Sequence, residues 1–376
     1  MLTFELDPHL LFAERSRQFA GWGIPWPVIR RVRSRITDCW HEGPGGWCRE
    51  WIQEAEAAER KGRFLLASML YGAARFPCVA TPLRAYALQR QVACFERAAP
   101  GFPVHFERRY LTCSDSNALT APVHLYTPRR AEELPLVLLS GGVDTGKMEL
   151  HRLACLLCRA GRFRVAAMDM PGTAESGVAL TADSHQLYQH WLDALAPSGR
   201  KAVLGVSFAG HWAAKLALLE AMDAAVDLGG PTVVFDSGSA FVHTLPNGMP
   251  GIIASALGFT RMPDEQSLAA LMRPFSLRRQ GLLERSGSIP TLVINGERDQ
   301  YIPQEDSTVL AHRPGHQVWL MRGMSHCAAE GLPRILPAMV AWLRLQLYGS
   351  TRTTRALMSL AELVLPPRIA PDALRR

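Results

Sequence analysis

The chain has 376 residues, of which 48% are hydrophobic and 20% are charged, and its mean hydropathy is +0.01. This balance is typical of a folded globular protein and excludes a disordered or fibrous chain. No run of eighteen apolar residues occurs, which excludes a transmembrane helix, and we expect no membrane partner. The N-terminus carries early acidic residues and lacks a basic start followed by an apolar core, so we expect no signal peptide.

The net charge of +7 comes from 41 basic and 34 acidic residues. The basic residues are mostly arginines scattered along the chain, and no nucleic-acid-binding module is recognisable, so we expect no nucleic-acid partner. The eight cysteines are irregularly spaced. Cys155 and Cys158 form a C-x-x-C pair inside an apolar helical stretch, which indicates buried small side chains. The sequence therefore predicts no metal, no disulfide framework and a cytoplasmic location.

Residues 1–103 are predicted to form an all-helical domain. Tryptophan and alanine recur at helical spacing over Gly46–Lys61, and a second helical stretch covers Arg63–Phe76. Because Gly62 separates the two stretches, they predict an antiparallel helix hairpin. A third helix is expected from Pro82 to Ala99.

From residue 104 the pattern changes to that of an α/β protein. Two strand-like segments, at 104–111 and 122–127, are followed by short apolar runs that alternate with helical stretches. Such runs predict a mostly parallel, doubly wound sheet that is buried on both faces. We therefore expect an α/β domain at 104–349 with a lid-like insertion at 229–288. A C-terminal helix and a mobile tail are expected at 350–376.

The segment Lys201–Gly210 carries the strongest catalytic pattern. Its sequence, KAVLGVSFAG, runs from an apolar strand into G-x-S and then into a helix, which is the context of a nucleophile elbow. Such a turn is strained, and small flanking residues let the hydroxyl of Ser207 stand clear of the backbone. The pattern departs from G-x-S-x-G at Ala209, whose side chain is small enough to keep the turn.

A serine nucleophile needs a base, and the base needs an acid that orients it. In α/β-hydrolases these residues follow one another in the order Ser, acid, His. Asp299 comes just past one predicted strand and His326 just past the next, so both are expected with Ser207 at the carboxyl ends of parallel strands. Glu297 and Asp306 are the rival acids.

The reaction also needs two backbone N–H groups that bind the negative charge developing on the substrate oxygen. One is expected from Phe208, which follows the nucleophile. The other is expected from Val143, because Gly141 and Gly142 allow a close approach of the loop after an earlier strand.

The same loop also matches a phosphate-binding motif. Gly141 to Lys147 fits G-x-x-x-x-G-K, but Met148 stands where a Mg²⁺-binding Ser or Thr belongs. Asp144 would place a carboxylate inside the phosphate cradle. With Asp169 in a D-x-x-G segment, a P-loop-like nucleotide hydrolase stays the alternative function, and a catalytically silent binding protein is a third.

Several segments together resemble the FrsA-like branch of the α/β-hydrolases: the helical N-terminal part, GGVDTGKME, DMPGTAES, GVSFAG and the Asp299–His326 pair. The resemblance runs from about Trp47 to Leu347. This branch includes 2,6-dihydropseudooxynicotine hydrolase and the polyketide-shortening hydrolases of pigment pathways. The resemblance implies a helical cap over the catalytic domain, a small-molecule substrate, no metal or cofactor, and often a homodimer. It also implies ester hydrolysis or hydrolytic C–C cleavage of ketones as the activity.

The resemblance places an acidic loop position of the family on Asp144, where the carboxylate would orient substrate. The alternative is that Asp144 caps a helix that begins near Gly146. Attack of Ser207 on a carbonyl would cleave an ester or thioester or, in a retro-Claisen reaction, a C–C bond of a polyketide or aryl ketone.

The pocket walls are expected from the N-terminal helices and from the insertion at 229–288. Candidate lining residues in the insertion are Phe235, Phe241, Met249 and Phe259, although core packing is the role expected for most of them. Asp236 and His243 lie in the same insertion and are weaker candidates for chemistry.

Overall fold

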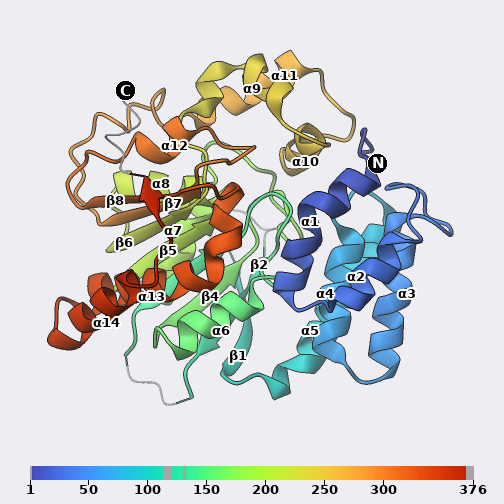
Figure 1. Ribbon diagram of the computed structural model, residues 1–376, viewed down its shortest axis with the longest axis horizontal. Coiled ribbons are helices and arrows are strands. Elements are labelled where there is room, and N and C mark those ends of the chain that lie inside the picture. Colours follow the sequence, from blue (N-terminus) through green and yellow to red (C-terminus); the bar gives the residue numbers. More distant parts are fainter. Residues whose placement is uncertain (1, 113–119, 130–132, 370–376) are drawn as a thin grey trace.

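The computed structural model describes residues 2–112, 120–129 and 133–369, and within them a nine-stranded sheet is flanked by helices (Figure 1). The strands are β1 (His105–Thr112), β2 (Thr120–Thr127), β3 (Leu136–Ser140), β4 (Arg164–Met168), β5 (Lys201–Val206), β6 (Ala224–Leu228), β7 (Thr291–Gly296), β8 (His316–Met321) and β9 (Arg368–Ile369). Their order in the sheet is β1-β2-β4-β3-β5-β6-β7-β8-β9. The six strands β3 to β8 run parallel to one another, whereas β1, β2 and β9 join the sheet antiparallel. The predicted α/β fold is confirmed.

Five helices precede the sheet: α1 (Pro8–Trp22), α2 (Trp26–Arg33), α3 (Trp47–Arg60), α4 (Phe64–Arg75) and α5 (Pro82–Ala98). The predicted hairpin corresponds to α3 and α4. Local sequence explains where α1 begins and ends. The side chain of Asp7 accepts hydrogen bonds from two amides of the first turn, Pro8 follows it, and Gly23 ends the helix with φ of 108°.

Nine helices follow within the described residues: α6 (His151–Arg159), α7 (His185–Leu195), α8 (Ala209–Leu218), α9 (Ser239–Thr244), α10 (Met249–Ala256), α11 (Glu265–Met272), α12 (Gln304–Thr308), α13 (Leu332–Tyr348) and α14 (Arg352–Glu362). Short 3₁₀ turns cover Ala99–Gly101, Val234–Ser237, Arg273–Phe275 and His326–Gly331. Residues 113–119, between the first two predicted strands, and residues 370–376 of the expected tail lie outside the described residues. The two-residue strand β9 was not predicted.

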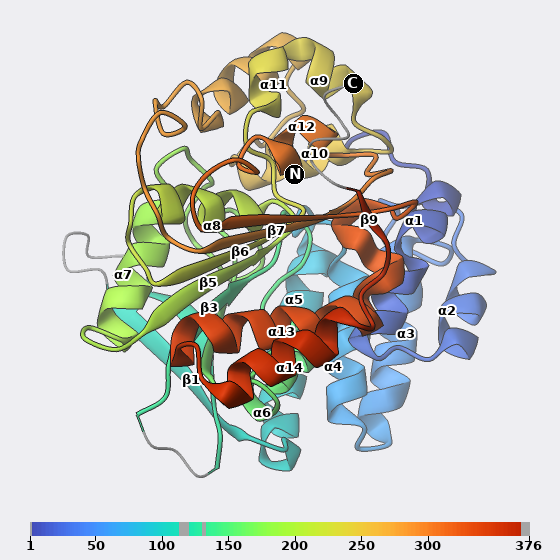
Figure 2. The same ribbon diagram turned by 60° about the vertical axis from the view of Figure 1, so that its left-hand side comes forward.

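The parallel strands β3 to β7 are mostly apolar and buried because helices cover both faces of the sheet there. In β3, Val137 and Leu139 pack in the core shared with α6, α13 and the N-terminal helices. Leu136 and Leu138 point to the opposite face and pack in the core shared with α7 and α8. Figure 2 shows α13 and α14 on one side of the strands and α7 and α8 on the other.

Two helical groups lie around the carboxyl ends of the parallel strands. Helices α1 to α5 lie together beside the sheet, and α9 to α11, from the predicted insertion, lie above the strand ends (Figures 1 and 2). Residues of α1 and of α9 to α11 line one pocket together with residues that follow β3, β5, β7 and β8.

Candidate active site

Ser207 occupies a strained turn between β5 and α8. Its φ is 57°, a left-handed value that is uncommon for a residue with a side chain, and its N–H donates to the Leu228 carbonyl at 2.8 Å. The turn depends on two close approaches: a Cβ at Gly205 would lie 2.0 Å from the Ala209 carbonyl oxygen, and one at Gly210 would lie 2.0 Å from Asp227 Oδ1. The buried methyl group of Ala209 is accommodated at the position where the motif departs from glycine.

The three residues predicted for acid, base and nucleophile form one hydrogen-bonded chain. His326 Nε2 lies 2.9 Å from Ser207 Oγ, and His326 Nδ1 lies 2.7 Å from Asp299 Oδ2. The other oxygen of Asp299 accepts the Tyr301 amide at 2.7 Å and the Ile302 amide at 3.1 Å. In this geometry the imidazole can take the hydroxyl proton of Ser207 while the carboxylate holds the ring in the required tautomer.

Charge coupling shifts both titrating partners. Burial raises the pKa of Asp299, but the His326 ring, the Tyr301 amide and the Asn295 side chain outweigh burial and lower it. Burial lowers the pKa of His326, but the neighbouring Cys327 sulfur and the Asp299 carboxylate raise it above its ordinary value. A base with a raised pKa becomes neutral, and so competent to accept a proton, only at higher pH.

The rival acids are engaged elsewhere. Glu297 accepts the Gly323 amide at 2.6 Å. Asp306 Oδ1 accepts the amides of Val233 and Val234 at 2.8 and 3.0 Å and so fixes the loop after β6. Among the described acids, Asp299 is the one bonded to the His326 ring.

The loop after β3 packs directly against the elbow. A Cβ at Gly142 would lie 2.8 Å from Ser207 Cβ and 3.2 Å from the Phe208 nitrogen. Val143 and Phe208 both border the pocket above Ser207. Within the described residues neither of these two amides has a protein acceptor, so both can donate to a substrate oxygen.

Asp144 does not cap a helix, so that interpretation is wrong. Residues after it form a turn, and α6 begins only at His151 with no side-chain cap. Asp144 is buried, accepts the Thr145 hydroxyl at 2.8 Å and pairs with Arg15 of α1 at 3.2 Å. Burial lowers the pKa of Arg15, but Asp144 and its other neighbours outweigh burial and raise it, so the guanidinium stays charged.

Five of the six predicted site residues line one pocket. The sixth, Asp299, is bonded to the His326 ring and does not line the pocket. The lining residues of the pocket are Arg15, Val143, Asp144, Ser207, Phe208, Pro231, Phe235, Phe241, Leu245, Met249, Ile253, Met272, Tyr301, Ile302 and His326. The walls come from α1 and from the insertion, as predicted, but Phe259 is only partly buried and packs against the core outside the pocket. Asp236 pairs with Arg278 and Arg279, and the exposed His243 pairs with Glu265, so neither belongs to this pocket.

Sequence reasoning missed two residues of this site. Arg15 gave no signal among the many scattered arginines, because its partner Asp144 is 129 positions away. Asn295, at the end of β7, donates to Asp299 Oδ2 at 2.8 Å and accepts the Cys327 amide at 3.0 Å. It thereby connects the acid to the backbone that carries His326, and its place four residues before Asp299 was the available clue.

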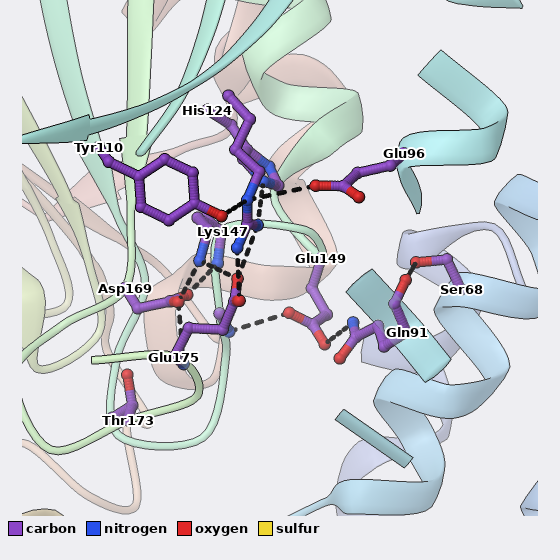
Figure 3. A network of polar contacts seen from close by, with 12 residues as sticks. Ser68, Gln91, Glu96, Tyr110, His124, Lys147, Glu149, Asp169, Thr173 and Glu175 are labelled. Carbon is purple, nitrogen blue, oxygen red and sulfur yellow. Dashed lines mark hydrogen bonds and ion pairs between the residues drawn. The ribbon is translucent and has the colours of Figure 1, made fainter. Parts of the chain in front are cut away.

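Lys147, the lysine of the apparent phosphate loop, is fully buried in a closed cluster of charges (Figure 3). Its ammonium group donates to Asp169 and, at 2.7 Å, to Glu175, and Arg108 binds Glu175 with two hydrogen bonds of 2.7 and 2.9 Å. Burial raises the pKa of Glu175, but Arg108 and Lys147 lower it to about 2. We call Lys147, Asp169, Glu175 and Arg108 the buried network. Because its carboxylates already bind the lysine, the structure argues against phosphate binding by this loop.

A second buried ion pair holds the same loop from the other side. Glu149 accepts hydrogen bonds from Arg75 of α4 at 2.6 Å and Gln91 of α5 at 2.7 Å, and its other oxygen accepts the Gly146 amide at 3.0 Å (Figure 3). The loop that brings Val143 to the elbow is therefore fastened to the N-terminal helices as well as to the sheet.

The parallel sheet with a serine elbow between β5 and α8 defines an α/β-hydrolase. A family model described as "Esterase FrsA-like" matches residues 39–347, and the chain belongs to this family of hydrolytic enzymes. Esterase FrsA of Photobacterium profundum is 26% identical over 330 residues, which cover 80% of this chain and 76% of that protein. Esterase FrsA of Salmonella typhi is 29% identical over 286 residues, covering 71% and 68%.

Solved structures share the fold. The wild-type structure titled AbyA5 superposes with a TM-score of 0.76 at 26% identity, covering 89% of this chain and 94% of that one. The crystal structure of the 2,6-dihydroxy-pseudo-oxynicotine hydrolase gives a TM-score of 0.68 at 20% identity, covering 88% and 95%. At that identity the second likeness concerns the fold alone.

No helix in the described ranges is long and apolar enough to cross a membrane. In the same part of the chain, no group of three or more His, Cys, Asp and Glu side chains is arranged to hold a metal ion.

Proposed function

We propose that this hydrolase uses Ser207 as nucleophile, His326 as general base and Asp299 as the orienting acid. The observation that carries the proposal is the continuous hydrogen-bonded chain from Ser207 Oγ through the imidazole to the carboxylate, with the hydroxyl at the pocket. The esterases named among the relatives support the same reaction class. The substrate is a small carbonyl compound, because the proposed nucleophile attacks a carbonyl and the pocket beside it is lined mostly by apolar side chains.

In the proposed mechanism, Ser207 attacks the substrate carbonyl while His326 takes its proton. The amides of Val143 and Phe208 stabilise the oxyanion of the tetrahedral intermediate. His326 then returns the proton to the leaving group, and water releases the acyl group from the serine by the same steps in reverse order. Asp144, held by Arg15, orients the substrate beside these groups.

Two kinds of bond fit this mechanism. In an ester or thioester the leaving group is an alkoxide or thiolate, which His326 can protonate directly. In a retro-Claisen cleavage the leaving group is a carbanion, which forms only where a neighbouring carbonyl or aromatic ring delocalises it. We propose polyketides and aryl ketones of secondary metabolism as substrates of the second kind. The division into a helical cap at 1–103 and a catalytic domain at 104–349, the homodimer and the cytoplasmic location stay predictions.

The test is the Ser207→Ala variant. We expect kcat on a p-nitrophenyl ester to fall by at least about 10³-fold, since removing a catalytic nucleophile has effects of this size or larger. The melting temperature should stay within error of the wild type, because the hydroxyl contributes little packing. Near-normal turnover by a folded Ser207→Ala protein would rule out the serine mechanism.

A further inference from the structure

Arg15 carries a buried charge into the pocket of Ser207. The residue is only 9% exposed, and it reaches the pocket from α1, a helix that no catalytic motif marks. Its guanidinium lies 5.4 Å from the ring centre of Tyr301, and that ring lies 5.0 Å from the His326 ring. A cation in this position is close to the reacting groups.

The guanidinium has more donors than protein partners. An arginine carries five N–H groups. The described partners of Arg15 are Asp144 Oδ2 at 3.2 Å and Gln18 Oε1 at 3.4 Å, and its Nε is buried with no hydrogen-bond partner within the described residues. Leaving donors of a buried guanidinium without acceptors is unfavourable, and because Arg15 borders the pocket, an oxygen that a ligand brings there would be stabilised.

The apolar walls of the pocket limit which substrates can reach the N–H groups of Arg15. Away from the catalytic residues and Asp144, the pocket is lined mainly by aromatic and aliphatic side chains. The hydroxyl of Tyr301 already interacts with Glu14 at 3.4 Å. A substrate that fits therefore has an apolar body and one oxygen, besides the scissile carbonyl, that accepts a hydrogen bond.

We propose that Arg15 donates a hydrogen bond to the second carbonyl oxygen of a 1,3-dicarbonyl substrate and stabilises the enolate that leaves. The proposal rests on the serine mechanism and the C–C cleavage proposed above, and it adds the residue that stabilises the leaving group. Arg15 then stabilises the negative charge on the leaving group, and the Val143 and Phe208 amides stabilise the negative charge on the attacked carbonyl oxygen.

The step balances with water as the only co-reactant. The Ser207 oxygen forms a bond to the attacked carbonyl carbon, and the imidazole holds the serine proton. The C–C bond to the central carbon then breaks, and its electron pair becomes the enolate of the second carbonyl. The imidazolium of His326 protonates the enolate carbon, and water hydrolyses the acyl-serine. The products are one carboxylic acid and one ketone.

Asp144 gives this donor its place and its strength. The carboxylate compensates the guanidinium in the free enzyme, so that burying the cation is tolerated. Toward a neutral ground-state carbonyl the pair then behaves as an ordinary donor. As negative charge develops on the enolate oxygen, the fixed N–H groups stabilise it more, and this difference accelerates the reaction.

The experiment compares two substrate types in four proteins. Wild type, Arg15→Met, Arg17→Met and Ser207→Ala are assayed on a panel of 1-aryl-1,3-diones and on p-nitrophenyl acetate. Met keeps most of the volume of the side chain and removes its N–H groups. Arg17 is the matched control, because it lies on the same helix with a mostly exposed side chain.

We expect Arg15→Met to lower kcat on the diones by about 10²–10³-fold, the range found when one oxyanion donor is removed. Turnover of p-nitrophenyl acetate should change by less than about threefold, because its phenolate leaving group needs no such help, and Arg17→Met should match the wild type on both. Three results would overturn the role of Arg15: a wild type that cleaves the ester but no dione, an Arg15→Met protein that cleaves diones normally, or an equal loss on both substrates. Ester turnover retained by Ser207→Ala would instead overturn the serine mechanism.

Discussion

The loop from Gly141 to Leu150 supplies charged residues to two clusters, the Arg15–Asp144 pair and the buried network. The two clusters differ in whether the cation keeps N–H donors available to a ligand. In the buried network the Lys147 ammonium contacts two carboxylates, and one of these, Glu175, is bound again by Arg108. In the pair, the guanidinium has N–H groups without partners among the described residues, and it borders a mostly apolar pocket.

Similar residue types therefore serve different purposes a few positions apart. Charges that are matched on all sides and excluded from the pocket contribute to the stability and shape of the loop. A charge that keeps spare donors beside a nucleophile can bind substrate. The phosphate-loop motif, the alternative interpretation of this loop, ends at Lys147, which lies in the buried network and not among the pocket-lining residues.

The largest expected effect is on kcat/KM, when the hydrogen bonds that join Ser207, His326 and Asp299 are disturbed. Asp299→Asn should lower kcat/KM by about 10⁴-fold, as expected when the acid of such a triad is replaced by its amide. Wild-type kcat/KM should rise with pH as His326 loses its proton, with a midpoint above the ordinary pKa of histidine, about 6.5. Because the carboxylate favours the imidazolium, the midpoint should move to lower pH in Asp299→Asn.

Initial rates measured from pH 5 to 10 test both parts of this prediction. Glu297→Gln is the control, since it changes the rival acid near the end of the same strand and should leave rate and midpoint unchanged. A midpoint that is the same in wild type and Asp299→Asn would contradict the assigned coupling of Asp299 and His326.

The next effect concerns the buried network. Lys147→Met leaves Asp169 and Glu175 without their shared cation and should lower the free energy of unfolding by about 3–5 kcal/mol, as breaking a buried ion pair does. Lys201→Met, which removes a more exposed pair with Asp193, should cost less than about 1 kcal/mol. Urea denaturation of the two variants measures both. Equal small losses would mean that the buried network does not stabilise the fold.

Asp144→Asn should have a smaller and different effect. The amide keeps the shape and an acceptor for Arg15 but removes the charge that holds the guanidinium. We expect kcat/KM on the 1,3-diones to fall about tenfold, equivalent to about 1.4 kcal/mol, with less change on p-nitrophenyl acetate. The loss of unfolding free energy should be smaller than in Lys147→Met. An equal response of both substrates would remove Asp144 from the site.

The last prediction is that added nucleotide has no effect on stability. Millimolar ATP or GTP with Mg²⁺ should leave the melting temperature unchanged, because the lysine of the apparent phosphate loop is already bound by carboxylates. A ligand at a hundredfold excess over its Kd would add about 2.7 kcal/mol of stability. An upward shift that depends on Mg²⁺ would therefore contradict the contrast between the two clusters.

The sequence predicted the fold well because its signals are local. Continuous apolar runs marked β3 to β8, and glycine and proline marked the ends of several helices. The two-residue strand β9 has no pattern of its own, since its formation depends on pairing with β8. The helix expected near Gly146 begins only at His151, after a turn whose amides at Gly146 and Lys147 are bound by Glu149 and Asp169.

The site was predictable only in part. Ser207, Asp299 and His326 each follow a strand, so parallel-sheet geometry was enough to bring them together. The partner of Asp144 depends on how α1 packs against the strand ends, and no local pattern encodes that contact between residues 15 and 144. Lys147 is the opposite case: a motif marks it, but the motif does not indicate that the fold places two carboxylates beside its ammonium group.

Covalent trapping tests the central claim, that Ser207 is the nucleophile of this pocket, most directly. The wild-type protein is treated with a fluorophosphonate, and its intact mass and its peptides are then measured. We predict one phosphonyl adduct per chain, on the peptide that contains Ser207, with no adduct in Ser207→Ala and slow labelling in His326→Ala. An active wild-type protein that gains no adduct, or gains it on another residue while Ser207 stays unmodified, would contradict the account.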